Sequence, residues 1–116
     1  MFATNVKCYN CGAFFPVTHF HLDCIRCGGM LDFQYDFRRI KRHINRGLLH
    51  EKKMTHWKYA AFYPVKDPAH AISLGEGNTP LIPFTRNENI SFKFEGVNPT
   101  GSFKDRGSTV EISKAM

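Results

Sequence analysis

The chain has 116 residues, with 16 lysines and arginines against 10 aspartates and glutamates, which gives a formal net charge of +6. Its hydrophobic fraction of 42% is ordinary for a folded protein and too high for a chain that is disordered throughout. No stretch approaches the roughly 18 consecutive apolar residues of a membrane span, and the first ten residues contain no apolar core of a secretion signal. These features argue against the membrane and exported classes, so we expect a cytoplasmic protein.

The first specific signal is a set of four cysteines in two Cys-x-x-Cys pairs, with twelve residues between the pairs. Each pair bends the backbone so that both sulfurs can reach one tetrahedral ion, and two pairs complete a four-thiolate zinc site. Two disulfides are the alternative, but a reducing compartment and the poor geometry of a Cys-x-x-Cys bridge disfavour them. Because a closed four-thiolate site has no open position, the zinc is expected to be structural. The expected metal ligands are Cys8, Cys11, Cys24 and Cys27.

Residues 1–35 are therefore predicted to form a small zinc-ribbon-like module. Such a short segment has little core, so the metal would supply much of its stability. Gly12, Gly28 and Gly29 follow the two cysteine pairs and would allow positive φ where the chain turns under the metal. His19 and His21 alternate with apolar neighbours, which predicts a strand over 17–22 with both imidazoles on one face rather than a role as ligands.

Residues 36–70 are predicted to be a basic helix and an aromatic connector. The spacing of Phe37, Ile40 and Ile44 indicates an amphipathic helix over 35–46, which Gly47 would end. Aromatic residues then cluster before a proline, and we expect them to pack against a neighbouring domain rather than stack on bases. This aromatic cluster is Trp57, Tyr59, Phe62 and Tyr63.

The excess positive charge lies in the first half of the chain. Up to Lys58 there are ten basic and four acidic residues, and from Tyr59 onward there are six of each. The basic residues are densest over 38–58, a pattern that could bind a phosphate backbone. A solvated helix or linker is the alternative, and no base-reading motif accompanies the charge.

The last third begins with the segment 73–81, SLGEGNTPL, a glycine-rich turn followed by an extended stretch. It is not a dinucleotide-binding fingerprint, because Pro80 stands where the third glycine would be. Alternation of apolar and polar residues over 90–95 predicts a strand. A turn at 98–101 then leads to a helix that should begin at or just after Ser102, since SFKD matches a helix-capping pattern.

Lys104 would lie in the first turn of that helix. The positive end of the helix and nearby Arg106 both disfavour an ammonium ion, and a neutral amine is the form that makes a Schiff base with an aldehyde cofactor. On physical grounds alone, a solvated lysine in a helix cap is the alternative. Asp105 and Arg106 are expected to form a charge pair at the start of the helix.

Several of these motifs resemble one enzyme family. The run 93–107, KFEGVNPTGSFKDRG, resembles the cofactor-lysine segment of threonine synthase, a fold-type II family that depends on pyridoxal phosphate. The segment 73–81, the cysteine pairs and the WKY run at 57–59 resemble the zinc-ribbon-bearing branch of that family. Phe103 before the lysine and KDRG from Lys104 favour threonine synthase over related dehydratases and cysteine synthases. Cysteate synthase and threonine synthase-like proteins remain alternatives.

The resemblance implies a zinc ribbon followed, over 71–116, by the first part of an α/β fold-type II pyridoxal-phosphate domain of the tryptophan synthase β type. Lys104 would hold the cofactor as a Schiff base and carry protons, and Phe103 would lie beside the cofactor. The family is a lyase of threonine biosynthesis that converts O-phospho-L-homoserine and water to L-threonine and phosphate. The resemblance also implies a small-molecule substrate and a homodimer for the full-length form. We expect no membrane partner, and a nucleic-acid partner is disfavoured.

The family's cofactor-phosphate cup and substrate loop follow this motif and are not in the sequence. We therefore expect the N-terminal fragment of a longer enzyme, or a truncated reading frame, that is incomplete and inactive as a lone chain. Two other classes stay open: a zinc-ribbon module that binds nucleic acid through its basic segment, and a non-catalytic regulator that pairs with a full-length enzyme.

Overall fold

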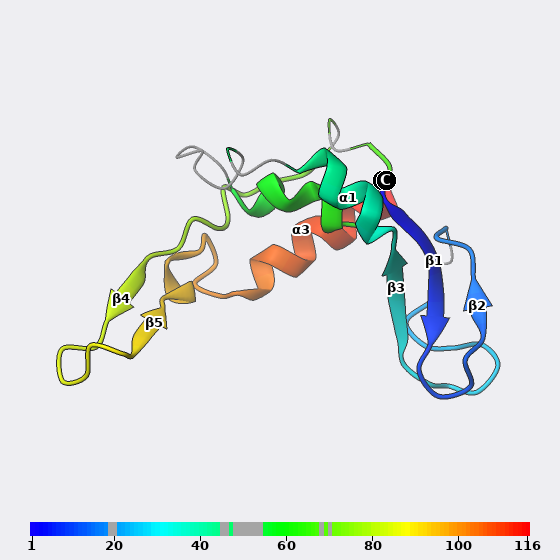
Figure 1. Cartoon of the computed structure of the whole chain (residues 1–116), viewed down its shortest axis with the longest axis horizontal. Coiled ribbons are helices and arrows are strands. Elements are labelled where there is room, and N and C mark those ends of the chain that lie inside the picture. Colours follow the sequence, from blue (N-terminus) through cyan, green and yellow to red (C-terminus); the bar gives the residue numbers. More distant parts are fainter. Residues whose placement is uncertain (19–20, 45–46, 48–54, 68, 70) are drawn as a thin grey trace.

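The computed structural model describes residues 1–18, 21–44, 47, 55–67, 69 and 71–116. A three-stranded sheet lies at one end of the molecule and a two-stranded hairpin at the other, with a long helix between them (Figure 1). The described elements are, in chain order, β1 (Ala3–Cys8), β2 (Phe14–Phe15), β3 (Leu31–Tyr35), α1 (Phe37–His43), η1 (His56–Phe62), β4 (Leu81–Pro83), β5 (Ser91–Lys93), η3 (Glu95–Val97) and α3 (Lys104–Ala115).

The N-terminal sheet is antiparallel, with β1 in the centre between β2 and β3. Val6 of β1 stands opposite Phe15 on one side and Phe33 on the other. The core beneath the sheet is small and includes two of the four cysteines, Cys8 and Cys24. The expectation of a small β-rich module is confirmed, and cysteines make up part of its small buried core.

The strand expected over 17–22 is wrong where the structure describes it. Val17 and Thr18 form a turn, and β2 ends at Phe15. Pro16 has no amide hydrogen to donate to β1, so pairing stops there. His19 lies outside the described residues, and His21 lies outside any strand.

The basic helix α1 is shorter than its apolar spacing predicts. Asp36 caps its start by accepting a hydrogen bond from the amide three residues on, at 3.0 Å. Ile40 is buried as expected, but Phe37 is 65% exposed. The helix ends at its seventh residue because Ile44 has an extended backbone. The proposed stop at Gly47 cannot therefore be the end of α1, and the two residues before it lie outside the described residues.

The aromatic connector packs through two of its four rings. Trp57 and Tyr63 meet edge to face, with ring centroids 5.4 Å apart. The indole nitrogen of Trp57 donates to the carbonyl of Ile72 at 3.1 Å. Tyr59 and Phe62 remain more than a third exposed. The connector is thereby joined to the start of the glycine-rich segment.

The C-terminal third contains the β4–β5 hairpin and the helix α3. The strand expected over 90–95 forms over 91–93, pairs with β4 and is followed by the short helix η3. α3 begins at Lys104, just after Ser102 as expected, but the predicted capping pattern does not form: the N-cap is Phe103, which makes no side-chain capping hydrogen bond. No helix in the described part of the chain is long and apolar enough to cross a membrane.

Candidate functional site

The four cysteine sulfurs lie together at one end of the N-terminal sheet, all within 4.8 Å of one another. The Sγ atoms of Cys8 and Cys27 are 3.6 Å apart, and those of Cys11 and Cys24 are 3.8 Å apart. All four cysteines are free. Sulfurs at about 2.3 Å from a tetrahedral zinc ion would be about 3.8 Å from one another. The cluster is therefore positioned to bind a metal, and its spacing fits zinc.

Matching backbone turns hold the two cysteine pairs. The amides of Gly12 and Gly28 each donate to the carbonyl of the first cysteine in their own pair, at 3.1 and 2.7 Å. Both glycines have positive φ, at 71° and 69°, as expected. Gly29 differs: its φ is not positive, and a Cβ atom there would lie 2.7 Å from Cγ of Asn10. The lack of a Cβ atom at Gly29 leaves room for the Asn10 side chain, whereas Gly12 and Gly28 supply positive φ.

Electrostatics in the cluster favour a bound cation. Backbone amides of Cys11 and Asn10 lower the pKa of Cys8 to about 7, against an opposing effect of burial. The Gly29 amide lowers the pKa of Cys27, but the neighbouring sulfurs outweigh it and raise that pKa to about 12. Like charges so close together resist joint ionisation. Four thiolates would coexist only around a positive ion.

A second polar cluster surrounds Glu76, in the middle of the glycine-rich segment. Its side chain is fully buried. Oε1 lies 2.5 Å from Nε2 of His56 and accepts from the Thr109 hydroxyl at 2.7 Å. Oε2 accepts from the Ser73 hydroxyl at 2.9 Å and the Leu74 amide at 2.7 Å. The carboxylate is fully hydrogen-bonded, as a buried charge requires.

The protonation of this cluster gives a first testable prediction. Burial would raise the pKa of Glu76, but hydrogen bonds from Thr109 and Ser73 outweigh it and hold the value at about 2. Burial lowers the pKa of His56 below 6.5, although Glu76 opposes this. As the pH falls, the unfolded chain therefore binds a proton at His56 before the folded chain does, so stability declines below about pH 6.5. Stability declines further below about pH 4.5, because the unfolded chain then binds a proton at Glu76 before the folded chain does.

A nuclear magnetic resonance titration of the His56 ring checks this prediction. The expected midpoint lies below 6.5 in the folded chain. A midpoint above 6.5 would mean that the carboxylate dominates over burial, and stability would then increase on acidification through that range.

A third cluster contains Arg106 and corrects one expectation. Arg106 does not pair with Asp105. Its Nε donates to Oε2 of Glu95 at 2.7 Å, and its Nη2 donates to Oε1 at 2.9 Å. The Thr79 hydroxyl also donates to Oε1, at 2.6 Å. Hydrogen bonds from Arg106 and Thr79 hold the pKa of Glu95 at about 2. Asp105 instead accepts from the amide and hydroxyl of Thr100.

These contacts join the two segments that carry the family resemblance. The Gly77 amide donates to Oδ1 of Asn98 at 2.9 Å, and the contacts of Thr79 with Glu95 and Arg106 form a parallel link. The segment 73–81 is thus fixed against the loop that leads into α3.

Gly77 allows a prediction with a matched control. It has φ 99°, and a Cβ there would lie 2.6 Å from the backbone nitrogen of His56. Gly75 has φ 84° with open space around it. Gly75→Ala should cost about 1–2 kcal/mol from backbone strain, and Gly77→Ala a further ~1–3 kcal/mol from overpacking. Urea unfolding of both variants measures the difference. Equal losses would show that the approach to His56 is not tight.

Lys104 is the first residue of α3, and its side chain is exposed. Its amide donates to the Ser102 hydroxyl at 3.2 Å. Among the residues that the structure describes, its ammonium group has no hydrogen bond or ion pair. Phe103 beside it is 63% exposed. Both side chains are accessible to a ligand, so Lys104 fits the requirement that a cofactor lysine be reachable.

Sequence reasoning missed the buried cluster of His56, Glu76 and Thr109. Each is an ordinary polar residue in its local context, and His56 and Thr109 are 53 positions apart. One signal was present: Glu76 is the one ionisable side chain in the glycine-rich segment 73–81.

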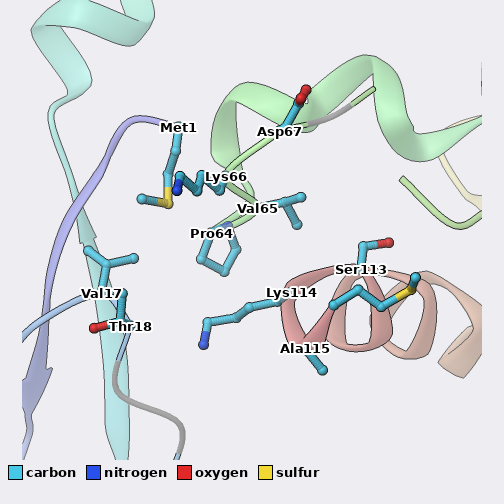
Figure 2. Close-up of a pocket in the computed structure, with 11 residues that line it drawn as sticks. Met1, Val17, Thr18, Pro64, Val65, Lys66, Asp67, Ser113, Lys114 and Ala115 are labelled. Atoms are coloured by element: carbon cyan, nitrogen blue, oxygen red, sulfur yellow. The ribbon is translucent and has the colours of Figure 1, made fainter. Parts of the chain in front are cut away.

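The N-terminal module meets the end of α3 around a cavity of about 590 Å³ (Figure 2). Pro64 and Val65 of the connector line this cavity together with Val17 of the module and Lys114 of α3. The Lys114 ammonium lies over the Phe33 ring of β3, 5.5 Å from its centroid. Neither Lys104 nor any of the four cysteines lines this cavity.

Several known proteins are similar in sequence to this chain. No family model matches the chain. It is 38% identical to the threonine synthase of Methanocaldococcus jannaschii over 115 residues, which cover 94% of this chain and 28% of that protein. It is 38% identical to the threonine synthase of Methanosarcina acetivorans, over 97% of this chain and 28% of that protein.

A third relative is the threonine synthase of Halalkalibacterium halodurans, 47% identical over 60% of this chain and 19% of that protein. The resemblance to threonine synthase seen in the motifs is thereby confirmed. The chain spans less than a third of the length of each of these relatives.

Proposed function

We propose that this chain is the N-terminal part of a threonine synthase, a pyridoxal-phosphate-dependent lyase in which Lys104 holds the cofactor. The observation that carries the proposal is the position of Lys104. It is exposed at the start of α3, directly after a loop that is fixed to the 73–81 segment by side-chain hydrogen bonds. Similarity to proteins named threonine synthase along nearly the whole chain supports this choice.

In this proposal each part of the chain has one role. Residues 1–35 are a structural zinc module, 36–70 a connector, and 71–116 the start of the catalytic domain. Bound pyridoxal phosphate would supply electron withdrawal from the substrate. Lys104 would hold the cofactor through its side-chain nitrogen and move protons between substrate carbons. Phe103 would lie against the cofactor.

The proposed reaction converts O-phospho-L-homoserine and water to L-threonine and phosphate. The proposed cellular location is the cytoplasm, and the proposed assembly of the full-length protein is a homodimer. A related pyridoxal-phosphate enzyme, such as a cysteate synthase, is the nearest alternative, because it would use the same lysine on another substrate.

The test begins with the DNA beyond the codon for Met116. We expect an in-frame continuation that encodes a glycine-rich phosphate cup. The product of the complete reading frame, loaded with pyridoxal phosphate, should release phosphate from O-phosphohomoserine, and the 116-residue chain should not. Phosphate release by the short chain would contradict the proposed incompleteness. A complete product that binds the cofactor and leaves O-phosphohomoserine intact would contradict the proposed substrate.

A further inference from the structure

Helix α3 is held in place by polar rather than apolar side chains. The three residues that it buries are Asp105, Thr109 and Ser113, which are spaced four apart and so share one face. Ile112 of the same helix is 50% exposed. Val110 is half-buried and is not part of the buried face, so hydrogen bonds along the polar face do most to fix the rotation of α3.

Each member of this polar face has a partner outside the helix. Asp105 accepts from Thr100 at the helix start. Thr109 donates to Glu76 in the glycine-rich segment. Ser113 accepts from the amide of Ile72 at 2.8 Å. Hydrogen bonds have strict distance and angle requirements, so these three contacts together fix both the rotation and the axial position of the helix.

The contact between Thr109 and Glu76 is the most deeply buried of the three, and Glu76 is charged. Glu76 is 0% exposed, Thr109 is 2% exposed and His56 is 3% exposed. His56 Nε2 lies 2.5 Å from Glu76 and 3.1 Å from the Thr109 hydroxyl. Losing one partner would leave a buried polar group unpaired, which costs more than an exposed hydrogen bond contributes.

We propose that His56 and Glu76 are positioning residues that set the orientation of α3 through Thr109 and thereby hold Lys104 in its exposed position at the start of the helix. The assignment of a chemical role to Lys104 rests on the proposed function. The helical turn of about 100° per residue places Lys104 roughly 140° around the axis from Thr109. A rotation of α3 would therefore carry the Lys104 amine away from its present direction.

Tyr63 lets His56 change protonation state without losing hydrogen bonds. The Tyr63 hydroxyl lies 2.9 Å from Nδ1 of His56 and 3.2 Å from the His56 carbonyl oxygen. When Nδ1 is unprotonated, the hydroxyl donates to it. When Nδ1 carries a proton, the hydroxyl accepts from it and donates to the carbonyl. The charged or titratable groups that act on the imidazole are Glu76, Tyr63 and Arg106.

The experiment measures amide hydrogen exchange along α3 in the zinc-loaded 116-residue chain, with the β1–β3 sheet as internal reference. Thr109→Val keeps the side-chain volume and removes the hydroxyl, and Glu76→Gln removes the charge. We expect both to lower protection over 104–115 at least tenfold. Thr109→Ser should restore it, and Ser108→Ala, an exposed change on the same helix, should leave it unaltered.

The pH dependence of amide protection in α3 distinguishes positioning of the helix through His56 from a general stabilisation of the fold. In the wild-type chain, protection of α3 relative to the sheet should decrease below about pH 6.5, following the His56 titration. In His56→Gln this decrease should be absent.

Three results would overturn the proposal: full protection in Thr109→Val, no rescue by Thr109→Ser, or an unchanged pH profile in His56→Gln. If Glu76→Gln fails to fold, the comparison of Thr109→Val with Thr109→Ser decides the outcome alone. None of these outcomes involves cofactor or substrate, so failure here would leave the phosphate-release test of the proposed function intact.

Discussion

Removing the metal from the cysteine cluster with a chelator is expected to unfold the N-terminal sheet of β1, β2 and β3, while α3 keeps its helical nuclear magnetic resonance shifts. The sheet has a small buried core that includes two of the cysteines, so little apolar burial would remain to hold it. Structural zinc in zinc-finger peptides contributes on the order of 10 kcal/mol. Elemental analysis should find one zinc per chain, and resonance dispersion of Val6 and Phe15 should collapse when zinc is removed.

Substitution in the second cysteine pair provides the matched control. Cys24→Ser should abolish stoichiometric zinc, whereas Ile25→Ser, at a neighbouring position that is 66% exposed, should retain it. A chain that keeps its native sheet without metal would contradict a structural role for zinc. Retention of one tightly bound zinc in Cys24→Ser would contradict the four-thiolate ligand set.

Replacing Lys104 by alanine in the product of the complete reading frame should have the largest effect on activity. Because the proposed lysine both holds the cofactor and moves a proton, phosphate release should fall by at least about 10²–10⁴-fold, the range for a lost general acid or base. Lys41→Ala changes an exposed lysine on α1 and should leave the rate unaltered. A Lys104→Ala protein with a normal rate would remove Lys104 from the mechanism.

Features that depend on neighbouring residues were predictable from the sequence. The cysteine pairs with their glycines predict a metal cluster because each pair forms its own turn. The approximate start of α3 was likewise predictable from the turn at 98–101 and the residues that follow it, although Phe103 rather than Ser102 is the N-cap. These elements require no knowledge of the rest of the chain.

Features that depend on distant partners were not predictable. Asp105 matches a capping pattern directed at Ser102, yet its carboxylate accepts from Thr100. Arg106 was expected to pair with its neighbour but reaches Glu95, eleven residues away. In both cases several acceptors or donors were available, and the tertiary fold decided among them. The end of α1 was missed because apolar spacing continues to Ile44, although the backbone there is extended.

Locating the covalently bound cofactor tests the central proposal most directly. The product of the complete reading frame would be loaded with pyridoxal phosphate, reduced with borohydride and digested, and the modified peptide identified by mass spectrometry. We predict a stable phosphopyridoxyl group on Lys104. Attachment to Lys93 or another lysine, or no attachment at all, would contradict the assignment of Lys104 as the cofactor lysine.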